Sequence, residues 1–466
     1  MDRKEFLKRL GVMTIGASLL GIDGKAFAAP KEIQDPSEDV DYINIPPKGL
    51  AADTKQMITA VVLGAGSRGT TYSKYAKLFP QSLKIVGVAD LNDFRRKRLA
   101  TSNEIEQKNC FSDFREAFVP GKLADVAIIT LPDGLHYEAC MKALELGYHV
   151  LLEKPVAQTE KECRDILAQS KKYGRIVAVC HVLRYAPYFR ALKQTLDSGI
   201  IGDVVSIQHQ EPIQYAHMAH SYVRGNWRSS KQTTPIILAK SCHDIDILRW
   251  LIGKPCKSVS ADGSLYLFKK ENAPENAARR CDAGCPLEST CPYSAIDIYV
   301  RKKRHLHVFD LNNRKDEQEI LSKLGPYGRC VFHCDNDQPD HYVANMTYEG
   351  GVTASFTMDA FTPHGGRRTR IMGTKGYIEG DMKRFTVYDF RTGKQKVWDK
   401  KVQEVADYKN SGHGGGDMAL VRDFLEAVSY EDPSRLTSSI DASIESHIIG
   451  FKAEKSRLSN KKIQIK

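Results

Sequence analysis

Residues 59–69 of this 466-residue chain read TAVVLGAGSRG, and this stretch decides the fold. The run 59–63 is apolar throughout, which is typical of a strand buried on both faces. Three glycines follow it at once in a G-x-G-x-x-G pattern: Gly64, Gly66 and Gly69. The amphipathic stretch at 70–79 then predicts a helix. A strand, a glycine-rich turn and a helix in this order predict a dinucleotide-binding site.

Each part of this pattern has a physical role. Gly64 permits the tight turn, Gly66 lets the backbone approach a pyrophosphate, and Gly69 lets the helix pack closely. The N–H groups of the helix N-terminus then face the phosphates. Asp90 follows the next apolar run, 83–89, where a carboxylate accepts hydrogen bonds from the adenosine ribose. The cofactor-binding residues predicted here are Gly64, Gly66, Ser67, Arg68, Gly69 and Asp90.

The choice between NAD and NADP stays open in the sequence. Asp90 favours NAD, because a carboxylate at this position pairs with ribose hydroxyls. Arg95 and Arg96 stand close by, where they could meet a 2′-phosphate. A solvated helix face explains the same two arginines equally well.

Strands and helices continue to alternate along the chain. Apolar runs at 124–131, 148–152 and 176–180 predict strands, and amphipathic stretches at 137–146 and 159–173 predict helices between them. The alternation predicts an α/β fold with a parallel, doubly wound sheet, whose ligands bind at the carboxyl ends of the strands. The residues that we expect beside the nucleotide at those ends are Thr130, Pro132, His136, Glu153 and Lys154.

Residues 147–155, which read GYHVLLEKP, resemble a motif of the glucose–fructose oxidoreductase / inositol dehydrogenase (Gfo/Idh/MocA) family. Further stretches extend the resemblance from about Met57 to the end of the chain: DGLH at 133–136, VLRY at 182–185, GIIG at 199–202, HDIDILRW at 243–250 and GGGD at 414–417. The resemblance implies an N-terminal Rossmann NAD(P)-binding domain over 57–180. It also implies a C-terminal α/β domain over 181–466 with a large, open, mostly antiparallel sheet, through which members often form homo-oligomers.

Two residues are the main catalytic candidates. Lys154 ends a predicted strand, and Pro155 restricts the backbone around it. In family members the matching lysine touches both nicotinamide and the substrate hydroxyl. His243 precedes an apparent amphipathic helix and is suited to proton transfer, because histidine titrates near neutrality. A surface lysine and a capping or core histidine are the alternatives.

The chain departs from the family four residues before His243. Many of the family's dehydrogenases carry an aspartate there, but this chain has Ala239, followed by Lys240. We therefore predict that Lys240 takes over substrate binding, or that proton transfer is arranged differently, and we count Lys240 among the catalytic candidates. Three further residues are predicted to contact substrate, with simple packing as the alternative: Arg184, Tyr185 and Asp244.

The resemblance implies an NAD(P)-dependent oxidoreductase that moves hydride between a carbinol carbon of a sugar, glycoside or polyol and nicotinamide. Two other functions stay open. One is a glycoside hydrolase or lyase of the same fold, which breaks its substrate through transient oxidation and elimination. The other is a non-catalytic sugar-binding protein with a vestigial nucleotide site.

Five of the eleven cysteines gather in one region, at Cys281, Cys285, Cys291, Cys330 and Cys334. Three thiolates and one further Cys or His hold zinc tetrahedrally, so we predict a structural zinc. Its predicted ligands are Cys281, Cys285, Cys291 and Cys330. Disulfides are the competing interpretation, because the compartment beyond the membrane is oxidising.

Residues 1–29 are typical of an export signal. A basic start is followed by an apolar run at 10–22 and an A-x-A cleavage site at 26–28. The run is too short for a permanent membrane span, and residues 2–8 resemble a twin-arginine (Tat) signal. We therefore expect a periplasmic protein without a membrane anchor in its mature form, a linker at 30–56, and a tightly bound cofactor, since free NAD is scarce outside the cytoplasm.

Charge and composition exclude other classes of protein. The formal net charge is +11, and it falls to +9 without the five basic and three acidic residues of 1–29. These charges form no dense basic block with interleaved aromatics, so we expect no nucleic-acid partner. Hydrophobic residues make up 42% and charged residues 27%, which excludes wholesale disorder.

Overall fold

The computed structural model describes residues 40–403, 408 and 412–465. The chain divides into two units, Met1–Asp41 and Tyr42–Lys466, and the short strand β1 (Asp41–Tyr42) spans their boundary. Everything described below belongs to the second unit. The predicted export signal and residues 30–39 of the predicted linker lie outside the described residues. Within the described ranges, no helix is both long and apolar enough to span a bilayer.

A parallel sheet forms the first domain, with the strand order β4-β3-β2-β5-β6-β7. Its strands are β2 (Ile58–Leu63), β3 (Leu83–Ala89), β4 (Cys110–Phe111), β5 (Val126–Ile129), β6 (His149–Leu152) and β7 (Val177–Val179). The last residues of neighbouring strands pair with one another: Leu63 with Ala89 and Ile129, and Ile129 with Leu152. The residues that follow these strands therefore meet at one edge of the sheet, as the sequence predicted.

Four helices accompany this sheet: α2 (Ser67–Leu78), α3 (Asp93–Asn103), α4 (His136–Glu145) and α5 (Glu160–Tyr173). Helix α2 begins at Ser67 rather than at residue 70, because Gly66 already adopts the extended backbone of an N-cap. Helix α5 begins with a capping box between Thr159 and Glu162 and ends at Gly174, whose left-handed backbone suits glycine.

The second domain carries a large mixed sheet in the order β15-β14-β13-β12-β8-β11-β10-β9-β16. Its strands are β8 (Val204–Gln214), β9 (Cys256–Ser264), β10 (His341–Tyr348), β11 (Thr353–Thr362), β12 (Arg368–Gly373), β13 (Gly376–Gly380), β14 (Arg384–Asp389), β15 (Gln395–Asp399) and β16 (Ile463–Gln464). Only β8 and β11 pair in parallel among these strands. The predicted α/β class with a mostly antiparallel second sheet is confirmed.

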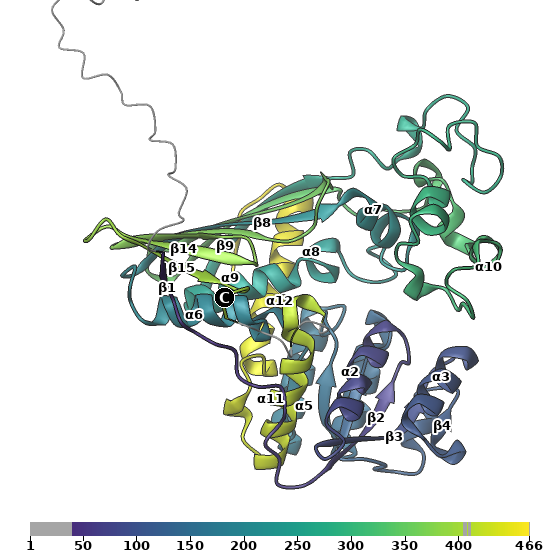
Figure 1. Cartoon of the computed structure of the whole chain (residues 1–466), viewed down its shortest axis with the longest axis horizontal. Coiled ribbons are helices and arrows are strands. Elements are labelled where there is room, and N and C mark those ends of the chain that lie inside the picture. Colours follow the sequence, from purple (N-terminus) through teal and green to yellow (C-terminus); the bar gives the residue numbers. More distant parts are fainter. Residues whose placement is uncertain (1–39, 404–407, 409–411, 466) are drawn as a thin grey trace, which may run out of the picture. The chain divides into compact units, whose positions relative to one another are not determined.

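Helices cover one face of this large sheet (Figure 1). Alternate residues of β10 and β11 are buried, and Tyr342, Phe356 and Met358 belong to the same hydrophobic core as Leu248 on α9. The helices of this domain are α6 (Pro187–Asp197), α7 (Tyr215–Met218), α8 (Ile236–Ala239), α9 (Cys242–Ile252), α10 (Glu317–Ser322), α11 (Gly416–Tyr430) and α12 (Ile440–Ser459).

The last two long helices also complete the first domain. Phe424 on α11 shares a hydrophobic core with Val62, and Ile444 on α12 shares one with Val150. The predicted boundary at residue 180 therefore separates the two sheets but not the two cores. The local sequence of α11 and α12 does not predict that they pack on the first domain, because this packing depends on tertiary contacts.

The described part of the predicted linker packs on the folded body. The ammonium of Lys48 lies 2.7 Å from the carboxylate of Glu426, and Leu50 is buried. Tyr75 donates a hydrogen bond to the Leu50 carbonyl (2.7 Å). Within the predicted linker, residues 43–55 therefore make specific contacts with α2, α11 and β15, which their polar composition does not indicate.

Candidate active site

The glycine turn fits a pyrophosphate. Gly64 has a φ of +98°, and a Cβ there would lie 2.6 Å from the Thr130 carbonyl oxygen. A Cβ on Gly69 would lie 2.1 Å from the Gly64 carbonyl oxygen. Beside Gly66, by contrast, there is open space, and the first turn of α2 has neither a side-chain cap nor an acidic residue. The N-terminal N–H groups at Ser67 and beyond are therefore available to an anion.

Asp90 holds the same turn. One carboxylate oxygen accepts from the Ala65 N–H (2.6 Å), and the other accepts from the Asn92 N–H (2.8 Å). The two nearby arginines bind protein groups: Arg96 donates to the Asp90 carbonyl (2.7 Å), and Arg95 pairs with Asp310 (3.0 Å). The carboxylate of Asp90 therefore lies beside the glycine turn, whereas the guanidinium groups of Arg95 and Arg96 bind other groups of the protein.

Three predicted residues connect the strand ends. The Thr130 hydroxyl donates to the Gly64 carbonyl (2.7 Å), which fixes the glycine turn. The two ring nitrogens of buried His136 lie 2.8 Å from the carbonyl oxygens of Leu131 and Pro155. Pro132 leads into the short helix η3 (Asp133–Leu135). Thr130 and His136 therefore shape the cofactor edge through hydrogen bonds within the protein.

A buried charge network lies beneath the turn. Arg68 contacts Glu153 (2.7 Å) and Asp417 (2.8 Å), and Tyr72 donates to Glu153 (2.8 Å). Burial alone would raise the pKa of Glu153, but Arg68 and Lys154 hold it below its usual value. The charged groups of Arg68 and Glu153, both predicted to contact the cofactor, face each other here, and Glu153 also accepts from the N–H of Lys154.

Lys154 connects the two domains. Its N–H donates to Glu153 (2.9 Å), which orients the backbone at the end of β6. Its ammonium donates to the carbonyl of Ala239 (2.8 Å), at the end of α8. Ala239 occupies the position where many family members have an aspartate, so a backbone oxygen here contacts the lysine in place of a carboxylate.

His243 lies at the start of α9, close to Lys154. The side chain is buried and its Nδ1 has no hydrogen-bond partner among the described residues. Burial, followed by the charge of Lys154 and the neighbouring imidazoles of His413 and His181, lowers the pKa of His243 well below its usual value. The imidazole is therefore uncharged at neutral pH, the state that a proton acceptor requires.

Lys240 belongs to a second charge network. Its ammonium lies 2.8 Å from a carboxylate oxygen of Glu211 on β8. Glu211 also accepts from Arg367 (2.7 Å) and from Ser241 (2.8 Å). Lys240 is partly exposed, whereas Glu211 and Arg367 are buried. The ammonium of Lys240 is therefore the partly exposed charge of this network, and the charges of Glu211 and Arg367 are buried.

The three residues predicted to contact substrate have partners within the protein: Arg184, Tyr185 and Asp244. Arg184 is buried and forms two hydrogen bonds with Asp246, at 2.6 and 2.7 Å. Tyr185 is buried and lies 2.8 Å from the Ser438 hydroxyl.

Asp244 is fully buried between Arg367 (2.8 Å) and His209 (2.9 Å). Burial alone would raise its pKa, but Arg367 and His209 hold it well below its usual range. Asp244, like Arg184 and Tyr185, is therefore held by buried polar partners.

Sequence reasoning missed several residues of this site. His413 pairs with Asp417 (3.0 Å), and its ring lies 5.8 Å from that of His243. Burial, followed by the charges of Lys240 and His305, lowers the pKa of His217 well below its usual value. The GGGD motif pointed to Asp417 without a role, and nothing in the local sequence singled out His217.

We predict that the protein loses stability in acid, because the imidazole of His181 is buried. Burial lowers the pKa of His181 to about 3, against about 6.5 in the unfolded chain. Below pH 6.5 only the unfolded chain takes up this proton, so stability falls as the pH falls towards 3. We expect His181 to account for about 2 kcal/mol of the loss between pH 6.5 and pH 5.

Urea unfolding of the protein at both pH values measures this effect. The variant His181→Leu should lose less stability on acidification, and His364→Leu, at an exposed position, should behave as the wild type. An unchanged pH dependence in the His181 variant would contradict the assignment.

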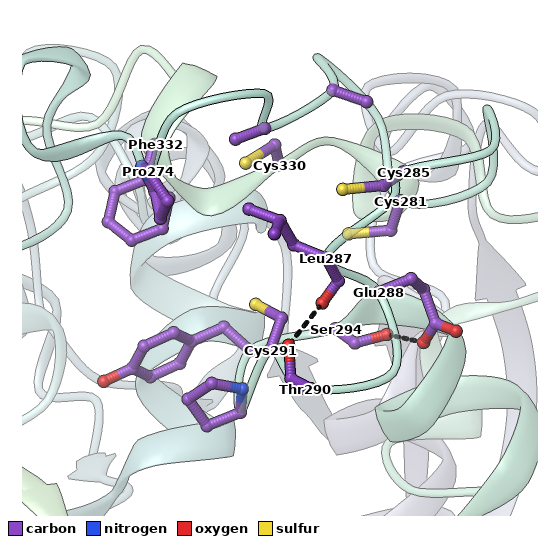
Figure 2. Close-up of a pocket in the computed structure, with 14 residues that line it drawn as sticks. Pro274, Cys281, Cys285, Leu287, Glu288, Thr290, Cys291, Ser294, Cys330 and Phe332 are labelled. Carbon is purple, nitrogen blue, oxygen red and sulfur yellow. Dashed lines mark hydrogen bonds between the residues drawn. The ribbon is translucent and has the colours of Figure 1, made fainter.

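The predicted zinc ligands line one cavity of about 270 Å³ (Figure 2). Cys281, Cys285, Cys291 and Cys330 all contribute to its wall. Each is a free thiol in the structure, so none of the four forms the disulfide of the competing interpretation. Cys334 lies outside the lining and donates to the Cys330 carbonyl (3.3 Å).

Comparison with known proteins agrees with this geometry. Residues 58–181 match the oxidoreductase family model with an NAD-binding Rossmann fold, and residues 193–446 match the C-terminal alpha/beta domain of that family. The Bacillus subtilis protein YteT is 29% identical over 65% of this chain and 72% of its own. Inositol 2-dehydrogenase of Serratia proteamaculans is 30% identical over 42% of this chain and 55% of its own.

Solved structures share the fold. An inositol dehydrogenase homologue from Azotobacter vinelandii, complexed with NADH and myo-inositol, has a TM-score of 0.63 at 15% identity, covering 90% of this chain and all of its own. Levoglucosan dehydrogenase, in complex with NADH and levoglucosan, has a TM-score of 0.63 at 16% identity, covering 88% of this chain and all of its own. Since the two family models match most of the chain, the protein belongs to the Gfo/Idh/MocA family of NAD(P)-dependent oxidoreductases.

Proposed function

We propose that the protein is an NAD-dependent dehydrogenase of a sugar, glycoside or polyol. The proposal rests on two groups that can donate or accept a proton and lie close together, the ammonium of Lys154 and the imidazole of His243. Lys154 ends a strand of the first domain, and its ammonium contacts Ala239, four residues before His243 in the second. The charge of Lys154 is also the largest electrostatic cause, after burial, of the lowered His243 pKa. A cationic donor and a neutral base thus stand together at the cofactor edge of the sheet.

Lys154, His243 and Lys240 have different roles in the oxidation of a substrate hydroxyl group. When NAD is bound, its nicotinamide supplies the acceptor for the hydride. The ammonium of Lys154 donates a hydrogen bond to the substrate oxygen and so favours its deprotonated form. The imidazole of His243 accepts the hydroxyl proton. Lys240, held by Glu211, binds a second substrate oxygen.

The relatives support a polyhydroxylated substrate. Several curated relatives are named inositol 2-dehydrogenases, and two similar structures contain myo-inositol or levoglucosan beside NADH. The curated match to the Serratia enzyme spans about half of that protein, and both structures are less than 25% identical to this chain. The substrate class is therefore proposed from the site chemistry together with these names.

A direct test separates the functions left open by the sequence. Full-length protein with NAD is incubated with myo-inositol, levoglucosan, glucose and 4-nitrophenyl glycosides, and the formation of NADH and of nitrophenol is followed. We expect NADH with at least one polyol or sugar. Nitrophenol without net NADH would replace the proposal with the hydrolase or lyase, and sugar binding without either product would replace it with the binding protein.

We predict NAD as the preferred cofactor, since Asp90 faces the turn while Arg95 and Arg96 bind protein groups. The variant Asp90→Ser should weaken NAD binding about 10- to 100-fold, the usual effect of losing a hydrogen bond to a charged group. NADP binding should change little or improve. Calorimetric titration after removal of bound nucleotide measures both, with Asp197→Ser as the surface control. Tighter binding of NADP by the wild type would contradict the prediction.

Export, tight cofactor retention and self-association are part of the proposal. They are supported by the pattern of residues 1–29, which lie outside the described residues, and by the open sheet. Cell fractionation of the full-length protein and of an Arg3→Gln, Lys4→Gln double variant tests export. Native mass spectrometry of the mature protein tests the rest. A cytoplasmic wild type, or a monomer free of nucleotide, would contradict these points.

A further inference from the structure

Four cysteine thiols line one cavity in the segment between β9 and β10, residues 265–340. The backbone brings two parts of this segment together, since Cys281 N–H donates to the Gly328 carbonyl (2.8 Å) and Cys330 N–H donates to that of Arg279 (2.9 Å). Cys285 and Cys291 follow Cys281 in the connecting loop. Figure 2 shows the four sulfur atoms on the wall of a single space.

The remainder of this cavity wall is largely apolar. Its side chains include Pro274, Ala277, Leu287, Pro292 and Phe332. The one carboxylate of the lining, Glu288, is held by Ser294 and by Arg301 (2.5 Å). Thiols surrounded by apolar groups form a soft ligand set, which selects thiophilic metals such as zinc and iron–sulfur clusters rather than magnesium or calcium.

A buried arginine indicates that this site carries negative charge. The Arg224 guanidinium is fully buried and forms no ion pair with a carboxylate among the described residues. Instead it donates to the Arg329 carbonyl (2.6 Å), the Tyr293 carbonyl (2.7 Å) and the Cys281 sulfur (3.6 Å), and its Nη1 has no hydrogen-bond partner among the described residues. A buried unpaired cation is costly, and a metal–thiolate centre beside it would supply the missing anion.

The spacing of the sulfurs distinguishes one metal ion from a cluster. Zinc–sulfur bonds of about 2.3 Å draw four thiolates into close contact and leave no cavity between them. Here the cavity has about 270 Å³. Among the described residues, the only three ligand atoms that lie within 4.8 Å of one another belong to His181, Cys242 and His243, so no three of the four thiols converge. A cluster, by contrast, gives each thiolate a different iron and spreads the ligands.

We propose that Cys281, Cys285, Cys291 and Cys330 bind a [4Fe–4S] cluster. Each thiol releases its proton to solvent as its sulfur bonds to one iron of the preassembled cluster. Arg224 then provides an N–H donor to a cluster ligand and compensates its charge. In place of the zinc ion predicted from the sequence, the site holds a polynuclear centre.

The cluster holds the segment that reaches the cofactor edge. Asp310, in the same segment, accepts from Asn92 (2.7 Å) and pairs with Arg95 (3.0 Å), two and five residues after Asp90. Residues 265–340 contain few regular elements, so the cluster supplies the cross-links that fix their position.

Metal analysis of the full-length protein tests the proposal without reference to its enzymatic activity. The protein is produced with added iron and purified without oxygen, and iron, zinc and acid-labile sulfide are measured beside native mass spectrometry. We expect about four irons and four sulfides per chain, as a cubane requires. One zinc without sulfide, or neither metal after reconstitution with iron and sulfide, would overturn the proposal.

Two matched variants assign the ligands. Cys285→Ser should lose most of the iron and sulfide, while Cys334→Ser should retain both, because Cys334 lies outside the cavity wall. Equal iron contents in the two would overturn the ligand assignment. Arg224→Lys should retain the iron and shift the reduction potential measured by a redox titration, because hydrogen bonds to the sulfurs tune it. An unchanged potential would contradict the role of Arg224.

Discussion

Replacement of Lys154 by methionine is expected to lower kcat for polyol oxidation about 10³-fold, within the usual range for loss of a proton-transfer group. Methionine keeps the length and the apolar stem of lysine but removes the ammonium group. The variant should still bind NAD, because the glycine turn and Asp90 lie on other strand ends. Steady-state kinetics with the polyol identified as substrate, and calorimetric titration with NAD, measure the two effects.

A matched control uses another lysine of the same domain. Lys142→Met removes an exposed ammonium paired with Glu145 on α4 and should leave kcat unchanged. Thermal unfolding of both variants separates catalysis from stability, since Lys154 also contacts the Ala239 carbonyl. A Lys154 variant that retains wild-type kcat would remove this lysine from the mechanism.

The second large effect is expected at His243. His243→Asn should lower kcat by 10²- to 10⁴-fold, because asparagine keeps a polar group in place but cannot accept the proton. Its pH profile gives a readout that a structural role would not move. Burial and the charge of Lys154 hold the pKa of His243 well below its usual value, so the base is neutral above that low pKa.

The sign of the pH effect follows directly. Protonation of His243 removes the base only as the pH falls through its lowered pKa, so wild-type kcat should stay level from pH 8 to pH 6. The acid limb below that range should be absent from His243→Asn. His364→Asn, at an exposed position, should retain the wild-type profile. A wild-type rate that falls with a midpoint near pH 6.5 would contradict a buried neutral base.

The local parts of the fold could be predicted from the sequence. The glycine turn, the alternating apolar runs and the EKP motif depend on residues close together in the chain, and the structure places Gly64, Asp90 and Lys154 at one edge of the sheet. Short-range sterics set these positions: at Gly64, for example, a positive φ and a close carbonyl both require glycine.

Long-range charge pairing could not be predicted. Lys240 follows the unusual Ala239 in the sequence, but its partner Glu211 lies on β8, and Arg367 joins the same network from just before β12. Arg184 follows a Rossmann strand as a ligand residue does, yet Asp246 holds it in the core. The sequence pattern marks strand ends, whereas burial decides which strand-end side chains remain available for a ligand.

In the cysteine region, too, the sequence predicts some features and only the folded structure contains the others. The gathering of five cysteines in the sequence predicted a structural zinc with four named ligands, but the choice between one metal ion and the proposed cluster depends on distances that the sequence does not contain. The backbone contacts at Cys281 and Cys330 and the buried guanidinium of Arg224 beside the Cys281 sulfur appear only in the folded protein.

The measurement that tests the central claim most directly is deuterium transfer. Full-length protein is incubated with NAD and with carbon-deuterated myo-inositol, levoglucosan and glucose, and the mass of the nucleotide is measured after one turnover. The account predicts NADH heavier by one deuterium with at least one of these compounds, and about 10³-fold slower labelling in Lys154→Met. Reduced nucleotide without deuterium, or equal labelling rates in the two proteins, would contradict it.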